Sequence, residues 1–149
     1  MKQEWLSMYY FRPTSTVLFV DGNKVNRQHW RQRLYISSPD YLILEADSGA
    51  AGLHICQSQR VDCVVTEHNL PDMSGFELLV KLVPRPTRPS IAVIMLSHVT
   101  LSSMATLALH SGAQGFLIKS RISGDDLDRA IQKAIAVVGS TRKEPPLCA

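Results

Sequence analysis

The sequence predicts a single α/β domain built on a doubly wound parallel sheet of five strands with five helices. Short apolar runs alternate with amphipathic runs about five times along the chain, and turn residues bound most of these runs. Residues that are apolar throughout a short run are typical of parallel strands covered on both faces. The chain has 149 residues, of which 45% are apolar and 19% charged, which suits one domain with a sizeable core.

The strands are predicted from apolar runs that are too short to be helices. The first of them, TVLFV, combines β-branched and aromatic residues, as buried strands do. We expect strands at Thr16–Val20, Tyr41–Ala46, Val61–Thr66, Ile91–Leu96 and Gly115–Ile118.

The helices are predicted from apolar residues at helical spacing between the strands. Prolines at positions 84, 86 and 89 end the third helix, Ser123 or Gly124 lies near the start of the last, and Gly139 lies just past its end. We expect helices at Lys24–Ile36, Ala50–Gln59, Gly75–Val83, Leu101–Leu109 and Asp125–Val138. The chain then divides into an N-terminal extension (1–14), a domain (15–139) and a polar tail or linker (140–149).

Composition disfavours several classes of function. The net charge is +3 without a basic run, which is too mild to indicate nucleic acid or an anionic membrane as partner. Cys56, Cys63 and Cys148 form no CxxC pair, so we expect reduced thiols rather than a disulfide framework or zinc site. The chain has no run of about 20 apolar residues and no apolar stretch typical of a secretory signal. A cytoplasmic location is therefore expected.

Polar side chains follow four of the predicted strands. Asp21 follows the first strand, Glu67 the third, Ser97 and then His98 the fourth, and Lys119 the fifth. In an open parallel sheet, ligands bind beyond the carboxyl ends of the strands. A single acid at such a place is more often a helix cap, but four corresponding positions indicate a site. Carboxylates suit Mg²⁺, whereas a hydroxyl and an ammonium suit phosphoryl oxygens.

Several segments resemble one known family. EHNLPDMSGFELL, at residues 67–79, is similar to the phosphoacceptor loop of bacterial response-regulator receiver domains. VLFVDGN (17–23) resembles the first strand and acidic turn of that family, and the pair Ser97–His98 and the segment GAQGFLIKS (112–120) resemble its switch hydroxyl and lysine segments. Order and spacing match across residues 15–138. The resemblance implies a flavodoxin-like fold with strand order 2-1-3-4-5 and a role in two-component (phosphorelay) signal transduction.

The resemblance also implies a role for each site residue. Asp21 is expected on the metal side of the site, and Glu67 occupies the phosphoacceptor position. The remaining roles are a backbone carbonyl for the metal from Asn69, a switch hydroxyl from Ser97, a switch aromatic from Phe116, and a partner for the carboxylate or phosphoryl group from Lys119.

The chain departs from the family pattern at the site itself. Position 67 is Glu rather than Asp, which moves the carboxylate by about 1.5 Å in a geometry where about 1 Å already matters. Position 22 is Gly, so the usual acidic pair after the first strand is reduced. His98 stands where the family has a small residue and could crowd a phosphodonor. Ser120 replaces a common proline, which leaves the isomer of the preceding bond open. His68 is expected to be a surface-loop histidine.

These departures suggest a degenerate receiver, a non-enzymatic pseudo-receiver that acts by protein–protein contact. Glu67 could reach Lys119 and partly imitate a phosphorylated aspartate, which would bias Ser97, Phe116 and the fourth helix toward an active-like state. The imitation is partial because a carboxylate has one charge and a phosphoryl group adds close to two. The alternative is an inert docking scaffold. We expect no cofactor, or Mg²⁺ bound weakly by Asp21, Glu67 and Asn69.

Two other functions remain open. One is a competent receiver that takes a phosphoryl group from a histidine kinase onto Glu67 with Mg²⁺. The other is a small flavodoxin-like ligand-binding domain, which is disfavoured because no glycine-rich loop follows the first strand. The resemblance implies a histidine kinase or an output (effector) domain as partner, or a homodimer. The implied contact face comprises the fourth helix, fifth strand and last helix, with Thr106, His110, Phe116, Arg121, Arg129 and Lys133.

Overall fold

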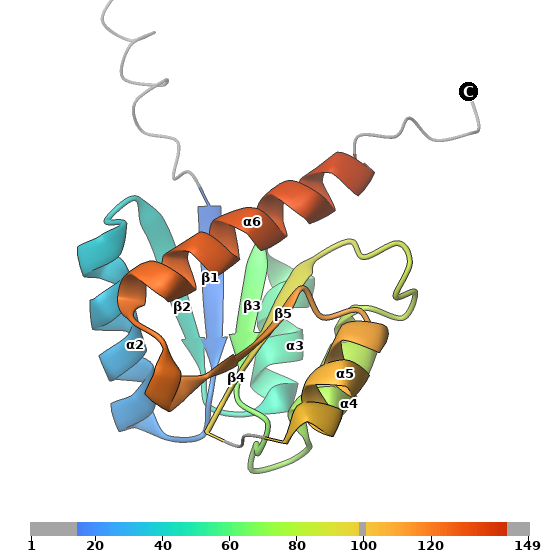
Figure 1. Cartoon of the computed structure of the whole chain (residues 1–149), viewed down its shortest axis with the longest axis horizontal. Coiled ribbons are helices and arrows are strands. Elements are labelled where there is room, and N and C mark those ends of the chain that lie inside the picture. Colours follow the sequence, from blue (N-terminus) through green and yellow to red (C-terminus); the bar gives the residue numbers. More distant parts are fainter. Residues whose placement is uncertain (1–14, 99–100, 143–149) are drawn as a thin grey trace, which may run out of the picture.

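The computed structural model describes residues 15–98 and 101–142, with side chains up to residue 139 (Figure 1). The chain alternates strands and helices throughout this part. Its elements are β1 (Ser15–Val20), α2 (Lys24–Ser37), β2 (Tyr41–Ala46), α3 (Gly49–Ser58), β3 (Cys63–Thr66), α4 (Gly75–Leu82), β4 (Ala92–Ser97), α5 (Ser102–His110), β5 (Gly115–Ile118), the short 3₁₀ helix η1 (Lys119–Arg121) and α6 (Gly124–Arg142).

The strands form one parallel five-stranded sheet in the order β2-β1-β3-β4-β5. The predicted fold class and strand order are therefore confirmed. The register brings the carboxyl ends of neighbouring strands to one edge, since Val20 pairs with Ala46 of β2 and with Thr66 of β3. The residues that directly follow these strands lie side by side for the same reason.

Helices cover both faces of the sheet (Figure 1). Helices α2 and α6 pack against one face, where Trp30 and Leu127 join one apolar cluster. Helices α3, α4 and α5 cover the other face and form a second cluster with it. Successive residues of β1 alternate between the two, with Phe19 in the first cluster and Leu18 and Val20 in the second. This period of two is the reason why the strand is apolar along its whole length.

Some predicted boundaries are wrong. Strand β3 begins at Cys63 rather than Val61, and the Asp62 carboxylate accepts a hydrogen bond from the Thr16 backbone N–H (2.8 Å). Helix α6 continues to Arg142 instead of ending at Val138. Gly139 does not stop it, because a glycine inside a helix costs only about 1 kcal/mol relative to alanine. The 3₁₀ turn η1 was not expected.

Helix α6 starts at Gly124, one residue before the predicted start, and the predicted cap at Ser123 is confirmed. The Ser123 hydroxyl accepts from the Asp126 backbone N–H (3.1 Å), and the Asp126 carboxylate accepts from the Ser123 N–H (2.9 Å), so two unpaired donors of the first turn are satisfied. No cis peptide bond occurs among the described residues, so the Lys119–Ser120 bond is trans. Within residues 15–98 and 101–142, no helix is long and apolar enough to cross a bilayer.

Candidate functional site at the carboxyl ends of the strands

The backbone of the sheet places two carboxylates next to each other. The Asp21 N–H donates to the carbonyl of Ala46 (3.1 Å), and the Glu67 N–H donates to the carbonyl of Val20 (2.9 Å). Both residues therefore continue the ladder by one hydrogen bond beyond their strands before the chain turns away. Their side chains leave adjacent strands at the same edge, as the sequence predicted.

Lys119 joins these two carboxylates. Its ammonium Nζ lies 2.9 Å from Asp21 Oδ2 and also contacts Glu67 Oε2. The exposed fractions of the three side chains are small, at 14% for Lys119, 13% for Asp21 and 5% for Glu67. Charges this poorly hydrated interact strongly, and neither carboxylate is tolerated there without its cation. The three groups form one ion cluster with two acids and one base.

The second oxygen of Glu67 faces two further groups. Oε1 accepts a hydrogen bond from the His68 backbone N–H (2.9 Å). It also lies 3.6 Å from His98 Nδ1, which is too long for a hydrogen bond but close enough for attraction when the imidazole is protonated. The side chain of His98 is 66% exposed. Sequence reasoning singled out His98 as an obstacle to a donor and missed its proximity to Glu67.

Asp21 is fixed from the α2 side of the site. Its Oδ1 accepts from the Asn23 N–H (2.8 Å), and its carbonyl accepts from Arg27 Nη1 (2.6 Å). The Arg27 guanidinium also bonds Glu45 on β2 (Nε–Oε1 3.2 Å), so one arginine links the acid turn to the edge strand. Sequence analysis did not find Arg27, because its role depends on which residue of β2 lies opposite α2.

The loop that contains Pro71 fills the space beside Gly22, the position where the family usually has a second acid. A Cβ atom at Gly22 would lie 2.9 Å from Cγ and 3.0 Å from Cδ of Pro71. Contacts under 3.0 Å are too close, so a side chain at position 22 requires the ring to move. Gly22 therefore removes a carboxylate, and Pro71 occupies the adjoining space.

The loop after Glu67 approaches the acceptor position closely. A Cβ atom at Gly75 would lie 2.5 Å from the carbonyl oxygen of Glu67, and the Gly75 N–H donates to the His68 carbonyl (2.6 Å). Only glycine fits such a backbone approach. The imidazole of His68 contacts the ring of Phe76 edge-on, with centroids 5.1 Å apart. His68 is partly buried rather than a fully exposed loop residue, and Asn69 beside it is exposed.

Asp72 ties the same loop to the start of α3. Its carboxylate accepts hydrogen bonds from the backbone N–H groups of Gly49 (2.8 Å) and Ala50 (2.9 Å). These two N–H donors hold the pKa of Asp72 below its usual value, as expected for an anion at a helix N-terminus. Sequence analysis missed this contact, since the partners are 22 and 23 residues away.

The two proposed switch residues lie on the neighbouring strands. Ser97 is the last residue of β4, is fully buried, and is paired in register with Ile118. Phe116 on β5 pairs with Met95 and packs, partly buried, against the cluster under α3, α4 and α5. Both residues therefore lie in the sheet, Ser97 at the carboxyl end of β4 and Phe116 near the start of β5, the strand that leads to Lys119.

The fold and the site define a class of protein, a doubly wound flavodoxin-like domain with an acid–lysine cluster at its strand ends. The family model for the response regulator receiver domain matches residues 17–132, and the chain belongs to this family. A solved receiver domain from Clostridium thermocellum superposes with a TM-score of 0.74 at 28% identity, covering 85% of this chain and 98% of that one.

Curated relatives agree with this assignment. The nitrate/nitrite response regulator protein NarL of Escherichia coli K12 is 28% identical over 122 residues, 82% of this chain and 55% of NarL. The two-component response regulator ORR5 of Oryza sativa subsp. japonica is 28% identical over 120 residues, 80% of this chain and 87% of ORR5. The chain thus spans about half the length of NarL.

Receiver domains are signalling modules rather than enzymes in the usual sense, and response regulators interact with histidine kinases and output domains. They typically bind Mg²⁺ for phosphorylation. The donor set here does not fit that ion. Gly22 supplies no carboxylate, Asp21 Oδ2 is paired with the Lys119 ammonium, and Asp21 Oδ1 accepts from a backbone N–H. Mg²⁺ requires near-ideal octahedral oxygen ligation, and the cavity beside the cluster measures about 10 Å³, roughly one water.

Proposed function

We propose that this chain is a receiver module that signals by protein–protein contact without a phosphorylation cycle. The observation that supports the proposal best is the ion cluster, in which Lys119 contacts Glu67 and lies 2.9 Å from Asp21. The receiver pattern assigns this lysine to the acceptor carboxylate or to the oxygens of an incoming phosphoryl group. Here the longer side chain of Glu67 reaches the lysine without one.

The cluster makes Glu67 a partial substitute for a phosphorylated aspartate. Its carboxylate meets the same ammonium that a phosphoryl oxygen would meet, but carries about one charge less. Such a substitute would act on Ser97 at the end of β4, which neighbours β3, and on Phe116 in β5, which neighbours β4. We therefore propose that the resting state of the chain is shifted toward the active-like state, by less than full phosphorylation would achieve.

A phosphorylation-competent receiver is the second candidate function, and Mg²⁺ binding separates the two. Trp30 is 5% exposed and lines the cavity next to Asp21 and Lys119, so its fluorescence reports on this site. The chain also contains Trp5, and the titration therefore uses a W5F background. We expect millimolar MgCl₂ to leave the emission unchanged. A saturable change that Ca²⁺ and added NaCl do not reproduce would favour the competent receiver.

We also propose a contact face made of α5, β5 and α6. Its exposed residues include Thr106, His110, Arg121, Arg129 and Lys133, beside the partly buried Phe116. Two leucines of α5 are more than half exposed, Leu107 at 54% and Leu109 at 52%. Apolar side chains grouped with charged ones are typical of interaction surfaces.

Sedimentation equilibrium of the wild type and of L109K tests which partner uses this face. If the partner is a second copy, the wild type sediments as a dimer and L109K as a monomer. If both sediment as monomers, the partner of this face is an output domain or a kinase rather than a second copy. A dimer that L109K does not weaken would contradict the assignment of the face.

A further inference from the structure

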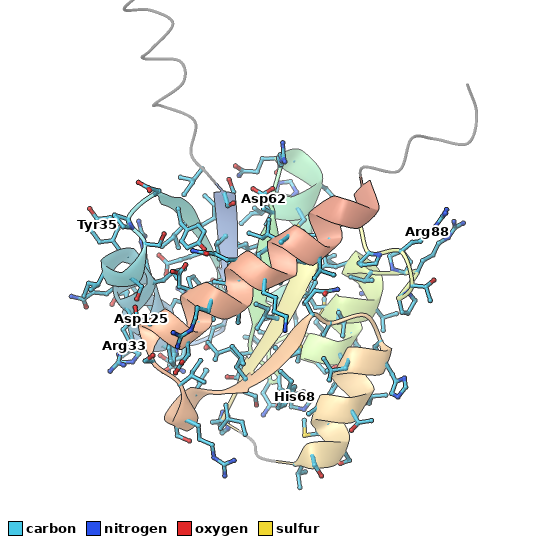
Figure 2. The ribbon with its side chains drawn as sticks, turned by 45° about the horizontal axis from the view of Figure 1, so that its top comes forward. Arg33, Tyr35, Asp62, His68, Arg88 and Asp125 are labelled. Carbon is cyan, nitrogen blue, oxygen red and sulfur yellow. The ribbon has the colours of Figure 1, made fainter. Side chains whose placement is uncertain are left out.

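A second pocket lies at the opposite end of the sheet from Glu67. It measures about 360 Å³, within the range of small-molecule sites. Figure 2 shows that Asp62 and His68, which flank β3, lie at opposite ends of the molecule; the pocket is at the Asp62 end. Its lining comes from the last turns of α3 and α4 and from the residues just before β3 and β4: Leu53, Cys56, Gln57, Gln59, Arg60, Val61, Lys81, Leu82, Ser90 and Ile91.

The lining is apolar at the base and cationic at the rim. Val61 and Ile91 are buried core residues, and only a small part of each side chain faces the pocket. Two of the lining residues, Arg60 and Lys81, are cations, and none is acidic. Polar Gln57, Gln59 and Ser90 complete the lining, so the pocket offers both apolar and polar contacts to a ligand that has an apolar and a charged part.

The two cations are available to a ligand. Arg60 pairs with Asp62 (3.3 Å), but its side chain is 80% exposed, and exposed pairs of this kind are weak. Lys81 forms no ion pair of 4.0 Å or less with any residue that the structure describes. Its charge acts at longer range on Asp72, where it contributes to the lowered pKa of that carboxyl. The C-terminal ends of α3 and α4 oppose an anion with roughly half a negative charge each. Two full positive charges outweigh these helix ends.

We propose that this pocket binds a small amphipathic anion, with its apolar body on the floor and a carboxylate, sulfonate or phosphate group at Arg60 and Lys81. The site is independent of the ion cluster at Glu67, so it does not depend on how that cluster functions. Helix α4 nevertheless connects the two ends. It starts at Gly75, which bonds the residue after Glu67, and its last turn carries Lys81.

The test uses two fluorescent probes of nearly the same shape. One is 8-anilinonaphthalene-1-sulfonate, an aromatic anion, and the other is N-phenyl-1-naphthylamine, which has the same rings without the sulfonate. We expect saturable binding of the sulfonate probe and roughly tenfold weaker binding to K81E and to R60E, as for the loss of one charge-assisted contact. K24E, an exposed charge reversal at the start of α2, is the matched control and should bind as the wild type does. The uncharged probe should not distinguish the variants.

Alkylation of Cys56 locates the probe. The thiol is half-buried in the pocket wall, and burial raises its pKa to about 11, so labelling with iodoacetamide is slow and is followed by peptide mass mapping at pH 9. We expect the sulfonate probe to slow this labelling in the wild type, and a roughly tenfold higher probe concentration to be needed for the same effect in K81E. Equal affinity of wild type, K81E and R60E, or unchanged labelling of Cys56 at saturating probe, would overturn the proposal.

Discussion

The ammonium of Lys119 lies 2.9 Å from the carboxylate of Asp21, although 98 residues separate them in the sequence. The same ammonium contacts Glu67. The arrangement is possible because β5 and β1 both end at the edge of the sheet where β3 ends. The site of this signalling family therefore holds its own cation between two carboxylates.

Removal of the cation should leave two carboxylates facing each other with little water. We expect K119M to lower the free energy of unfolding by about 2–4 kcal/mol, since breaking a buried pair leaves an uncompensated charge. Urea denaturation followed by circular dichroism measures this. K24M, at an exposed position at the start of α2, controls for the loss of one positive charge, and a loss of the same size there would contradict the argument.

A double substitution tests whether the ion cluster acts as a unit. E67Q removes one of the two acids, and we expect K119M to cost less in the E67Q background than in the wild type, with a coupling of about 1–3 kcal/mol. The four proteins of the cycle are compared by urea denaturation. Additive effects would mean that Lys119 and Glu67 do not interact in solution.

Two glycines should respond to alanine in opposite ways. At Gly75 a Cβ atom would lie 2.5 Å from the Glu67 carbonyl, whereas at Gly139 it would meet nothing within 4 Å. We expect G75A to destabilise by roughly 2–3 kcal/mol and G139A to stabilise by about 0.5–1 kcal/mol, because alanine favours the helix. Thermal unfolding of both variants checks the pair. A neutral G75A would show that the acceptor loop is less tightly packed than described.

Asp72 should stabilise the fold in a pH-dependent way. Its folded pKa is lowered by hydrogen bonds from the Ala50 and Gly49 N–H groups, so the unfolded state, with a pKa near about 3.9, binds its proton first as pH falls. The contribution is present above about pH 4 and is lost as pH falls through the folded pKa. We expect D72N to melt at a lower temperature than the wild type at pH 7, with the difference shrinking below pH 4. A difference independent of pH would argue against the charged cap.

Much of the fold and part of the site follow from sequence patterns. Hydrophobic periodicity and turn residues locate each strand and helix, and strand order in a parallel sheet places Asp21, Glu67 and Lys119 at one edge. The predicted ends of helices and strands are wrong where the residue that should end the element is only a weak signal. Gly139 looked like a helix end, but a Cβ atom there would meet no other described residue within 4 Å, and the helix continues past it.

The remaining contacts could not be predicted because they depend on distances between loops. Pro71 closes the space beside Gly22, Arg27 reaches both the Asp21 carbonyl and β2, and Asp72 caps α3. Each joins segments whose separation is fixed only by the packed sheet and its helices. The pocket between the ends of α3 and α4 is of the same kind, since its ten lining residues come from these two helices and from the segments just before β3 and β4.

The absence of a phosphorylation cycle is tested most directly by intact-mass measurement after incubation with acetyl phosphate and MgCl₂. A receiver that keeps aspartate at the acceptor position serves as the positive control, and E67Q identifies the site if any addition occurs. The account predicts that the wild-type mass stays unchanged while the control gains one phosphoryl group. Stoichiometric addition of one phosphoryl group to the wild type, abolished in E67Q, would contradict it.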